Sequence, residues 1–210
     1  TDERIRRDMR HLGAYAIDRE GAAEVDDAVS IEYLDNGREK LWIHIADVSR
    51  WVRPGSKLSL EAEKRMTSLY MPDERISMFP EILTTELLSL GAMTDSYALS
   101  CGVTLNEEGE VDSYEVCPSR VRITQRLSYQ QLDDILAAQN ITLDGAKSLS
   151  LDGNGQSSSR LSESEMIAFD LGRLYWYALL RNRRRIENDG ALDDMLRHKT
   201  ELTLVVRERD

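Results

Sequence analysis

The stretch AYAIDREGAAEVDDAVSIEY, residues 14–33, places a dense group of carboxylates between two runs with the alternating pattern of β-strands. Five of the ten residues from Asp18 to Asp27 are acidic, and Arg19 is the only basic residue among them. Carboxylates this close repel one another, so a fold that keeps them ionised needs a nearby cation. The small residues GAA at 21–23 would let the chain bend and bring both ends of the group together.

The acidic group is a candidate metal site. Only oxygen ligands are available, and a hard divalent ion suits them, so we expect Mg²⁺, or Mn²⁺ in its place, as the cofactor. Such an ion can activate water and polarise a phosphoryl oxygen, which is the chemistry of phosphodiester hydrolysis. From spacing alone, a solvated acidic loop is the commoner arrangement, and the ligand order of an EF-hand is missing. The pattern D-x5-E-x-D-D consists of Asp18, Glu24, Asp26 and Asp27.

Composition limits the class of protein. The chain has 210 residues, of which 41% are hydrophobic, so it can form one large domain or two small ones with a sizeable core. No apolar run approaches the ~18 residues of a membrane span, and the charged start TDERIRRDMR lacks the apolar stretch of a signal peptide. Cys101 and Cys117 lack metal-ligand spacing, so we expect reduced core cysteines and no zinc site. We therefore expect an intracellular protein in a reducing compartment, with no membrane partner.

The basic residues are unevenly distributed. A net charge of −11 argues against a uniformly basic surface for nucleic acid, but it permits a local basic channel. Arginines gather in RITQR at 122–126 and in RNRRR at 181–185. For RNRRR two interpretations are equally open, namely the last turn of a helix facing its negative dipole end, or a contact with RNA.

Strand and helix signals alternate along the chain, which predicts a mixed α/β or α+β domain. Residues 28–34 and 40–48 alternate like strands, and Asn36-Gly37 between them is typical of a hairpin turn. A second hairpin is expected over 97–124, broken by NEEGE at 106–110. Shorter helical segments are expected at 58–69, 80–90 and 128–139.

The clearest helix follows a stretch rich in Gly and Ser at 144–160, which we interpret as a flexible loop. Ser162 and Glu165 form a capping-box pattern, and Asn188 to Gly190 supply the stop. One face of this helix would carry Ile167, Leu171, Leu174 and Ala178. The final segment at 200–210 has a strand-like pattern without an obvious partner. The organisation expected is a metal-site part at 1–139, a loop at 140–160, and a helix and final strand at 161–210.

Several motifs together resemble one family. The sequences YAIDREGAAEVDDAVSIE, LWIHIADVSRWVRPGS, LEAEKRMTSLYMPDERISMFPEIL and RLSYQQLDDIL are similar to successive motifs of the ribonuclease II family catalytic domain, or RNB domain. The resemblance runs from about Arg7 to Leu192. It implies the N-terminal portion of an RNB-type fold, with a mixed β-sheet and packed helices. It also implies a magnesium-dependent exoribonuclease that removes nucleotides from the 3′ end of single-stranded RNA and releases 5′-monophosphates.

The resemblance assigns roles to particular residues. Asp18, Asp26 and Asp27 fall on family aspartates of the metal and catalytic site. Glu24 falls where the family has a further Asp, and its extra methylene displaces the carboxylate by roughly an ångström. Tyr70 matches a tyrosine near the terminal nucleotides of the RNA.

Tyr129 matches a second RNA-binding tyrosine, close to the scissile phosphate. Stacking on an aromatic face tolerates any base, as a degradative enzyme requires. Without the family match, a half-buried core residue is the commoner role for either tyrosine. His44 lies between apolar strand neighbours, so we interpret it as structural.

The chain departs from the family pattern in ways that leave two functional hypotheses. Asp194 lies where the family often has an aromatic clamp, and later family motifs, including one with an arginine at the scissile phosphate, are absent from the sequence. On the first hypothesis, the chain is part of an exoribonuclease that a second chain or a longer polypeptide completes. On the second, it is a catalytically inactive, RNB-derived structural or RNA-docking subunit of a ribonucleoprotein assembly.

Overall fold

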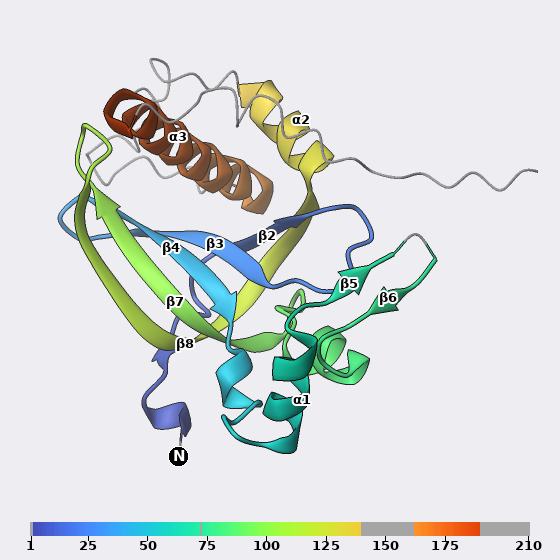
Figure 1. The fold of residues 1–210 in the computed structure, drawn as a ribbon. Helices are drawn as coiled ribbons and strands as arrows, with labels where there is room; N and C mark the ends of the chain where they lie inside the picture. Colours follow the sequence, from blue (N-terminus) through green and yellow to red (C-terminus); the bar gives the residue numbers. More distant parts are fainter. Residues whose placement is uncertain (1, 72, 140–161, 190–210) are drawn as a thin grey trace, which may run out of the picture.

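A strongly curved β-sheet with helices on its outer side forms the body of the protein (Figure 1). The computed structural model describes residues 2–71, 73–139 and 162–189. The sheet has the strand order β1-β8-β2-β3-β4-β7, and β7 also pairs with β8, so the sheet closes on itself. Its strands are β1 (Arg7–Asp8), β2 (Ala14–Asp18), β3 (Asp27–Tyr33), β4 (Glu39–Ala46), β7 (Asp95–Leu105) and β8 (Val111–Ser128).

Closure depends on β8, an 18-residue strand with two main neighbours. Residues 111–122 of β8 pair antiparallel with β7, and residues 123–128 run parallel to β2. The β3–β4 hairpin is antiparallel, and Gly37 in its turn has a φ of 77°, the left-handed conformation that glycine adopts readily. The expected mixed sheet with packed helices is confirmed.

The interior of the closed sheet is narrow and is filled mainly by small side chains around one tryptophan. Trp42 is completely buried, and its indole nitrogen donates a hydrogen bond of 2.8 Å to Glu32. Gly102 lies opposite Trp42 in the β4–β7 register, where a Cβ atom would be 2.7 Å from the indole ring. The other buried members of this core are Met9, Ala14, Ala16, Val25, Ala28, Ala46, Leu90, Ala98, Val121 and Ile123.

A chain of buried hydrogen bonds also crosses the interior. His44 Nε2 lies 2.9 Å from Ser30 Oγ, and Nδ1 lies 2.6 Å from Ser100 Oγ, which is 2.5 Å from Ser119 Oγ. Ser119 donates to the carbonyl of Ala98, so it accepts from Ser100, which in turn accepts from His44 Nδ1–H. His44 is therefore neutral with its proton on Nδ1, and burial lowers its pKa to about 4. Its interpretation as a structural residue is confirmed.

Two helices cover part of the outer face of the sheet. They are α2 (Tyr129–Gln139) and α3 (Glu163–Asp189), which crosses above β2 and β3 in Figure 1. Asp170 of α3 accepts hydrogen bonds of 2.7 Å from the hydroxyls of both Tyr15 and Tyr33, which ties the helix to β2 and β3. The apolar contacts below the helices involve Tyr15, Ile17, Val29, Leu127, Leu132, Ile135, Ile167, Leu171 and Leu174.

The capping box expected at the start of α3 is present. Glu165 N–H donates to Ser162 Oγ, and Ser162 N–H donates to the Glu165 carboxylate at 2.7 Å. The segment RNRRR lies before the last turn of α3, so its interpretation as the last turn is wrong. Instead, Arg184 pairs with Glu110 of the β7–β8 turn and Arg183 pairs with Glu187.

Two expected helices differ in extent from the prediction. The helix expected at 58–69 is α1 (Lys57–Arg65), because Met66 takes a left-handed φ of 63° and ends it. The chain then forms a small hairpin of β5 (Leu69–Tyr70) and β6 (Arg75–Ile76). Only a short π-helical turn, η3 (Leu83–Leu87), forms within 80–90. The remaining short turns are η1 (Asp2–Arg4) and η2 (Val48–Arg50).

Part of the outer face of the sheet, over β4, β7 and β8, carries exposed apolar side chains. We call this the outer apolar face, and it consists of Ile43, Ile45, Leu99, Tyr114 and Val116. Cys101 is half-buried on the same face and Cys117 packs against the core, and both are free thiols, so only Cys117 fits the expected core position.

Some expectations fall outside the residues that the structure describes. These are the loop at 144–160, Asp194 and the strand-like segment at 200–210. No helix within the described ranges has the length and apolar character needed to span a bilayer.

Candidate functional site

The acidic loop, residues 19–26, joins β2 to β3 and is fixed to its surroundings at several points. Val25 is buried, its N–H donates to Ser89 Oγ at 3.0 Å, and its carbonyl accepts from Leu90 N–H at 2.8 Å. The carbonyl of Asp26 accepts from Ala46 N–H at 2.9 Å, so the loop is joined to the end of β4. These bonds hold the loop in one conformation although most of its side chains are polar.

Strand register places three aspartates at neighbouring strand ends. Asp18 is the last residue of β2 and Asp27 is the first of β3, with Asp26 directly before it. Burial and neighbouring carboxylates raise the pKa values of Asp26 and Asp27. Partial burial, then the charges of Glu24, Asp27 and Asp18, raise the pKa of Asp26. For Asp27 the causes are partial burial and then the charge of Asp18. These aspartates therefore form one patch of unfavourable negative charge, which a cation would relieve.

Glu24 lies near Asp26, whose pKa its charge helps to raise, and it also forms an ion pair. Its Oε1 lies 3.2 Å from Arg75 Nη1 in β6, and its side chain is only 14% exposed. Arg75 is the register partner of Tyr70 in β5, so this ion pair joins the acidic loop to the β5–β6 hairpin. Sequence reasoning missed Arg75 because nothing within its own segment signals a partner about fifty positions away.

The donor set fits a hard divalent ion in its chemistry, but its side chains do not converge in this conformation. Across residues 2–71, 73–139 and 162–189, no group of three His, Cys, Asp or Glu side chains is arranged to hold a metal ion. The aspartates supply only oxygen atoms, as magnesium prefers. The side chain of Glu24 would have to leave Arg75 to join them.

Both candidate RNA-binding tyrosines are exposed. Tyr70 is 66% and Tyr129 is 56% accessible, so neither is the half-buried core residue that we gave as the alternative. Tyr129 begins α2 directly after Ser128, the register partner of Asp18. Ser128 and Gln131 cap this helix reciprocally, with Ser128 N–H donating to Gln131 Oε1 at 2.8 Å, so the start of α2 is fixed beside Asp18.

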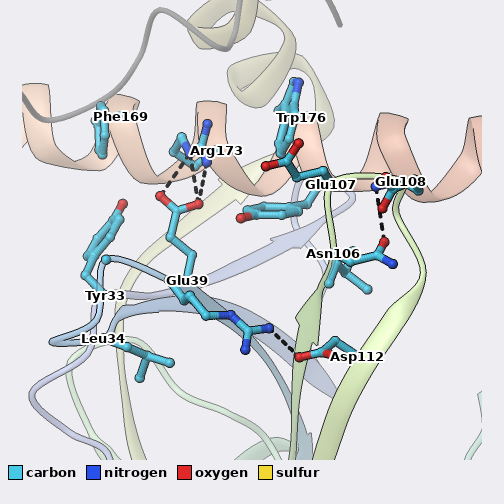
Figure 2. A pocket seen from close by; sticks show the side chains of 14 residues that line it. Tyr33, Leu34, Glu39, Asn106, Glu107, Glu108, Asp112, Phe169, Arg173 and Trp176 are labelled. Carbon is cyan, nitrogen blue, oxygen red and sulfur yellow. Dashed lines mark hydrogen bonds and ion pairs between the residues drawn. The ribbon is translucent and has the colours of Figure 1, made fainter.

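A large cavity lies at the opposite end of β3. It measures about 840 Å³ and is bounded by the β3–β4 turn, the β7–β8 turn and α3 (Figure 2). Figure 2 shows Glu39 reaching toward Arg173 of α3, and Arg38 pairs with Asp112 at 2.5 Å. Because its arginines are matched by these carboxylates and Glu107 and Glu108 add further negative charge, this cavity does not suit a phosphate.

Comparison with known proteins agrees with the motifs. A family model described as the RNB domain matches residues 6–209. An uncharacterized ribonuclease from Synechocystis sp. is 47% identical over 129 residues, which are 61% of this chain and 19% of that protein. The chain thus spans about a fifth of the length of this curated relative.

Solved structures share the fold. RNase R from Mycoplasma genitalium, in complex with double-stranded RNA, superposes with a TM-score of 0.71 at 22% identity, over 87% of this chain and 29% of that chain. Yeast Ssd1, described as a pseudonuclease, superposes with a TM-score of 0.59 at 26% identity, over 71% of this chain and 20% of that chain. Since the family model matches nearly the whole chain and the fold agrees with it, this chain belongs to the RNB family.

Proposed function

We propose that this chain supplies the metal site of a magnesium-dependent exoribonuclease that degrades single-stranded RNA from its 3′ end to 5′-nucleoside monophosphates. The observation that supports this most directly is the position of Asp18, Asp26 and Asp27 at adjacent strand ends, where the charge of Asp18 acts on both other aspartates. Membership of the RNB family and the ribonuclease name of the Synechocystis relative support the same assignment.

The proposed roles follow from position. Asp18, Asp26 and Asp27 would hold Mg²⁺, or Mn²⁺, and Glu24 would contribute after turning from Arg75. When bound, the ion would polarise a phosphoryl oxygen and lower the pKa of a water molecule. The fixed backbone of the acidic loop would hold the carboxylates in position while the substrate binds.

Tyr129 and Tyr70 would orient the RNA. Tyr129, beside the register partner of Asp18, offers an exposed ring next to the reacting phosphate. Tyr70 would stack on a neighbouring base, and its hairpin is tied to the acidic loop through Arg75 and Glu24. A stack on an aromatic face contributes about 1–3 kcal/mol per base without selecting its identity.

The test is cleavage of a labelled single-stranded oligoribonucleotide, blocked in turn at each end, with Mg²⁺ or with EDTA. The chain is supplemented with a second polypeptide that carries the remainder of an RNB relative. We expect monophosphate release from substrates with a free 3′ end, its loss in Asp27→Asn, and its retention in Asp35→Asn, a matched change in the exposed β3–β4 turn. Equal activity in the two variants would overturn the assignment of the site.

A second candidate function is a non-catalytic RNB-derived subunit that docks RNA within a ribonucleoprotein assembly. The observation that favours it is the ion pair of Glu24 with Arg75, which already provides this carboxylate with a cation. On this alternative, the chain binds RNA with equal affinity in Mg²⁺ and in EDTA, and the supplemented mixture releases no monophosphate.

A further inference from the structure

We propose that a cleft beside the end of β4 is a second binding site for single-stranded RNA, which holds one phosphodiester group and one base away from the carboxylates. This inference rests on the proposed function for the identity of its ligand. The cleft has a volume of about 610 Å³. We call it the arginine pocket, and it is lined by Arg6, Asp47, Ser49, Arg50, Trp51 and Arg53.

The charge of the arginine pocket is opposite to that of the whole chain. Its lining contains three arginines and one aspartate, whereas the chain has a net charge of −11. Arg6 Nη2 donates a hydrogen bond of 2.6 Å to Asp47, and the Arg6 side chain is only 4% exposed, so this pair forms the buried base of the cleft. The exposed Arg53 contributes positive charge at the surface of the pocket, and Arg50, which is partly buried, also lines it.

Asp47 is already occupied as a hydrogen-bond acceptor. Besides Arg6, it accepts from the hydroxyl of Ser49 at 2.6 Å. Burial alone would raise the pKa of Asp47, but the bonds from Ser49 and Arg6 outweigh burial and keep the pKa below its ordinary value. Asp47 thus stays ionised and is bonded to Arg6 and Ser49.

Arg50 lies beside two aromatic rings of this region. The guanidinium of Arg50 lies 3.7 Å from the ring centroid of Tyr97 and 5.5 Å from that of Trp51. Trp51 is 39% exposed, so part of its ring is accessible to a ligand. Arg53 is exposed and makes no ion pair with a described carboxylate. An arginine fork matches phosphate oxygens, and a bare indole ring stacks on a base.

The location connects this pocket to the candidate metal site. Asp47 follows Ala46, whose N–H donates to the carbonyl of Asp26, and Ile45 is the register partner of Asp27. The pocket therefore begins at the same end of the sheet as the carboxylates, on the neighbouring strand. A single strand of RNA lying across these two strand ends would meet the arginines at one point and the metal site at another.

The test measures binding of a fluorescent oligouridylate by anisotropy in EDTA, where metal-dependent cleavage does not contribute. We expect Trp51→Ala to weaken binding at least about fivefold, the lower end for loss of one stacked base, and Trp51→Phe to retain it. Arg53→Ala should reduce the slope of log affinity against log salt by about 0.7, as expected for one lost phosphate contact. Arg38→Ala, an exposed arginine in the turn at the other end of β4, is the matched control and should leave binding unchanged.

The outcomes separate this inference from the proposed function. Cleavage that proceeds normally while Trp51→Ala and Arg53→Ala bind RNA like the parent would overturn the arginine pocket and leave the enzyme assignment intact. RNA binding that is weakened by Trp51→Ala and Arg53→Ala, without any cleavage by the parent, would overturn the enzyme assignment and leave the arginine pocket intact. Displacement of RNA by a phosphopeptide, with Trp51→Ala unaffected, would show a general anion site and would contradict the nucleotide assignment. If Trp51→Ala lowers the melting temperature, its weaker binding could come from unfolding. The salt dependence of binding by Arg53→Ala then tests the arginine pocket by itself.

Discussion

Gly102 is a position where the absence of a side chain determines whether the interior packs. A Cβ atom there would be 2.7 Å from two carbons of the Trp42 ring, and that ring is enclosed by the sheet. We predict that Gly102→Ala lowers the free energy of unfolding by about 1–3 kcal/mol, the usual cost of overpacking a core. Urea denaturation measures this. Trp42→Phe in the same chain should recover part of the loss, whereas strict additivity of the two changes would contradict direct contact.

His44 makes stability depend on pH. Its pKa is about 4 in the folded chain against about 6.5 in an unfolded one, so the unfolded state binds more protons between these values. Stability should therefore fall as pH decreases from about 6.5 to about 4, by roughly 3 kcal/mol from this residue. Denaturation curves at several pH values should show a steeper dependence in the parent than in His44→Gln. Identical slopes would mean that His44 titrates normally when folded.

The grouped aspartates predict measurable binding of divalent ions. Partial burial and then neighbouring carboxylates raise the pKa values of Asp26 and Asp27, and a bound cation would offset the repulsion between the carboxylates. Calorimetric titration of Mg²⁺ and Mn²⁺ should show weaker binding to Asp27→Asn than to the parent. Asp35→Asn controls for the loss of one charge, and equal affinity in all three proteins would contradict a metal site here.

At the scale of elements, a single ion pair holds the β5–β6 hairpin against the acidic loop. Arg75 is only 25% exposed and Glu24 only 14%, so their interaction is less screened than an ordinary surface pair. We predict that Arg75→Ala speeds amide hydrogen exchange at Met71, whose N–H bonds to Glu74 within the hairpin, and leaves the exchange in α3 unchanged. Lys64→Ala, an exposed change on α1, is the control. Unchanged exchange at Met71 would show that the hairpin is held by other contacts.

Elements with local signals could be predicted from the sequence, and those that depend on distant partners could not. The Asn36-Gly37 turn and the Ser162–Glu165 cap are decided by residues within a few positions, and both were predicted. The helix expected at 58–69 is longer than α1 because no local signal marks Met66 as left-handed. The hairpin after it was missed because its two strands contain only two residues each.

The same distinction applies to the candidate site. The acidic residues are close in sequence, so their spacing alone suggested a shared site. Their neighbours were not predictable: Ser128 meets Asp18 through parallel pairing across 110 positions, and Arg75 reaches Glu24 from another hairpin. The sequence identifies Arg126 only as part of a basic segment, and its hydrogen bond to the carbonyl of Ala22 was not predictable. Local patterns identified the candidate ligands, whereas tertiary pairing fixed their orientation.

At the scale of the whole molecule, we predict negligible RNA degradation by the 210-residue chain alone. Metal ligands and a water molecule are only part of what phosphoryl transfer needs, since positive donors must also stabilise charge on the phosphate. A second polypeptide carrying the rest of an RNB relative should restore activity. Asp27→Asn should then abolish the restored activity, in the same oligonucleotide assay. Robust cleavage by the unsupplemented chain, lost in Asp27→Asn, would contradict this requirement.

The dual pairing of β8 has a consequence for synthesis on the ribosome. β2 is among the first strands to emerge, but its neighbour is the final part of β8, residues 123–128. Until these residues leave the exit tunnel, β2, β3 and β4 can form only an open, incomplete sheet, and the start of α2 beside Asp18 does not yet exist. Nascent chains would therefore expose the unpaired edge of β2 from the emergence of Asp18 to that of Ser128, which is 110 residues of translation, and in this interval they are most open to aggregation and to chaperone binding.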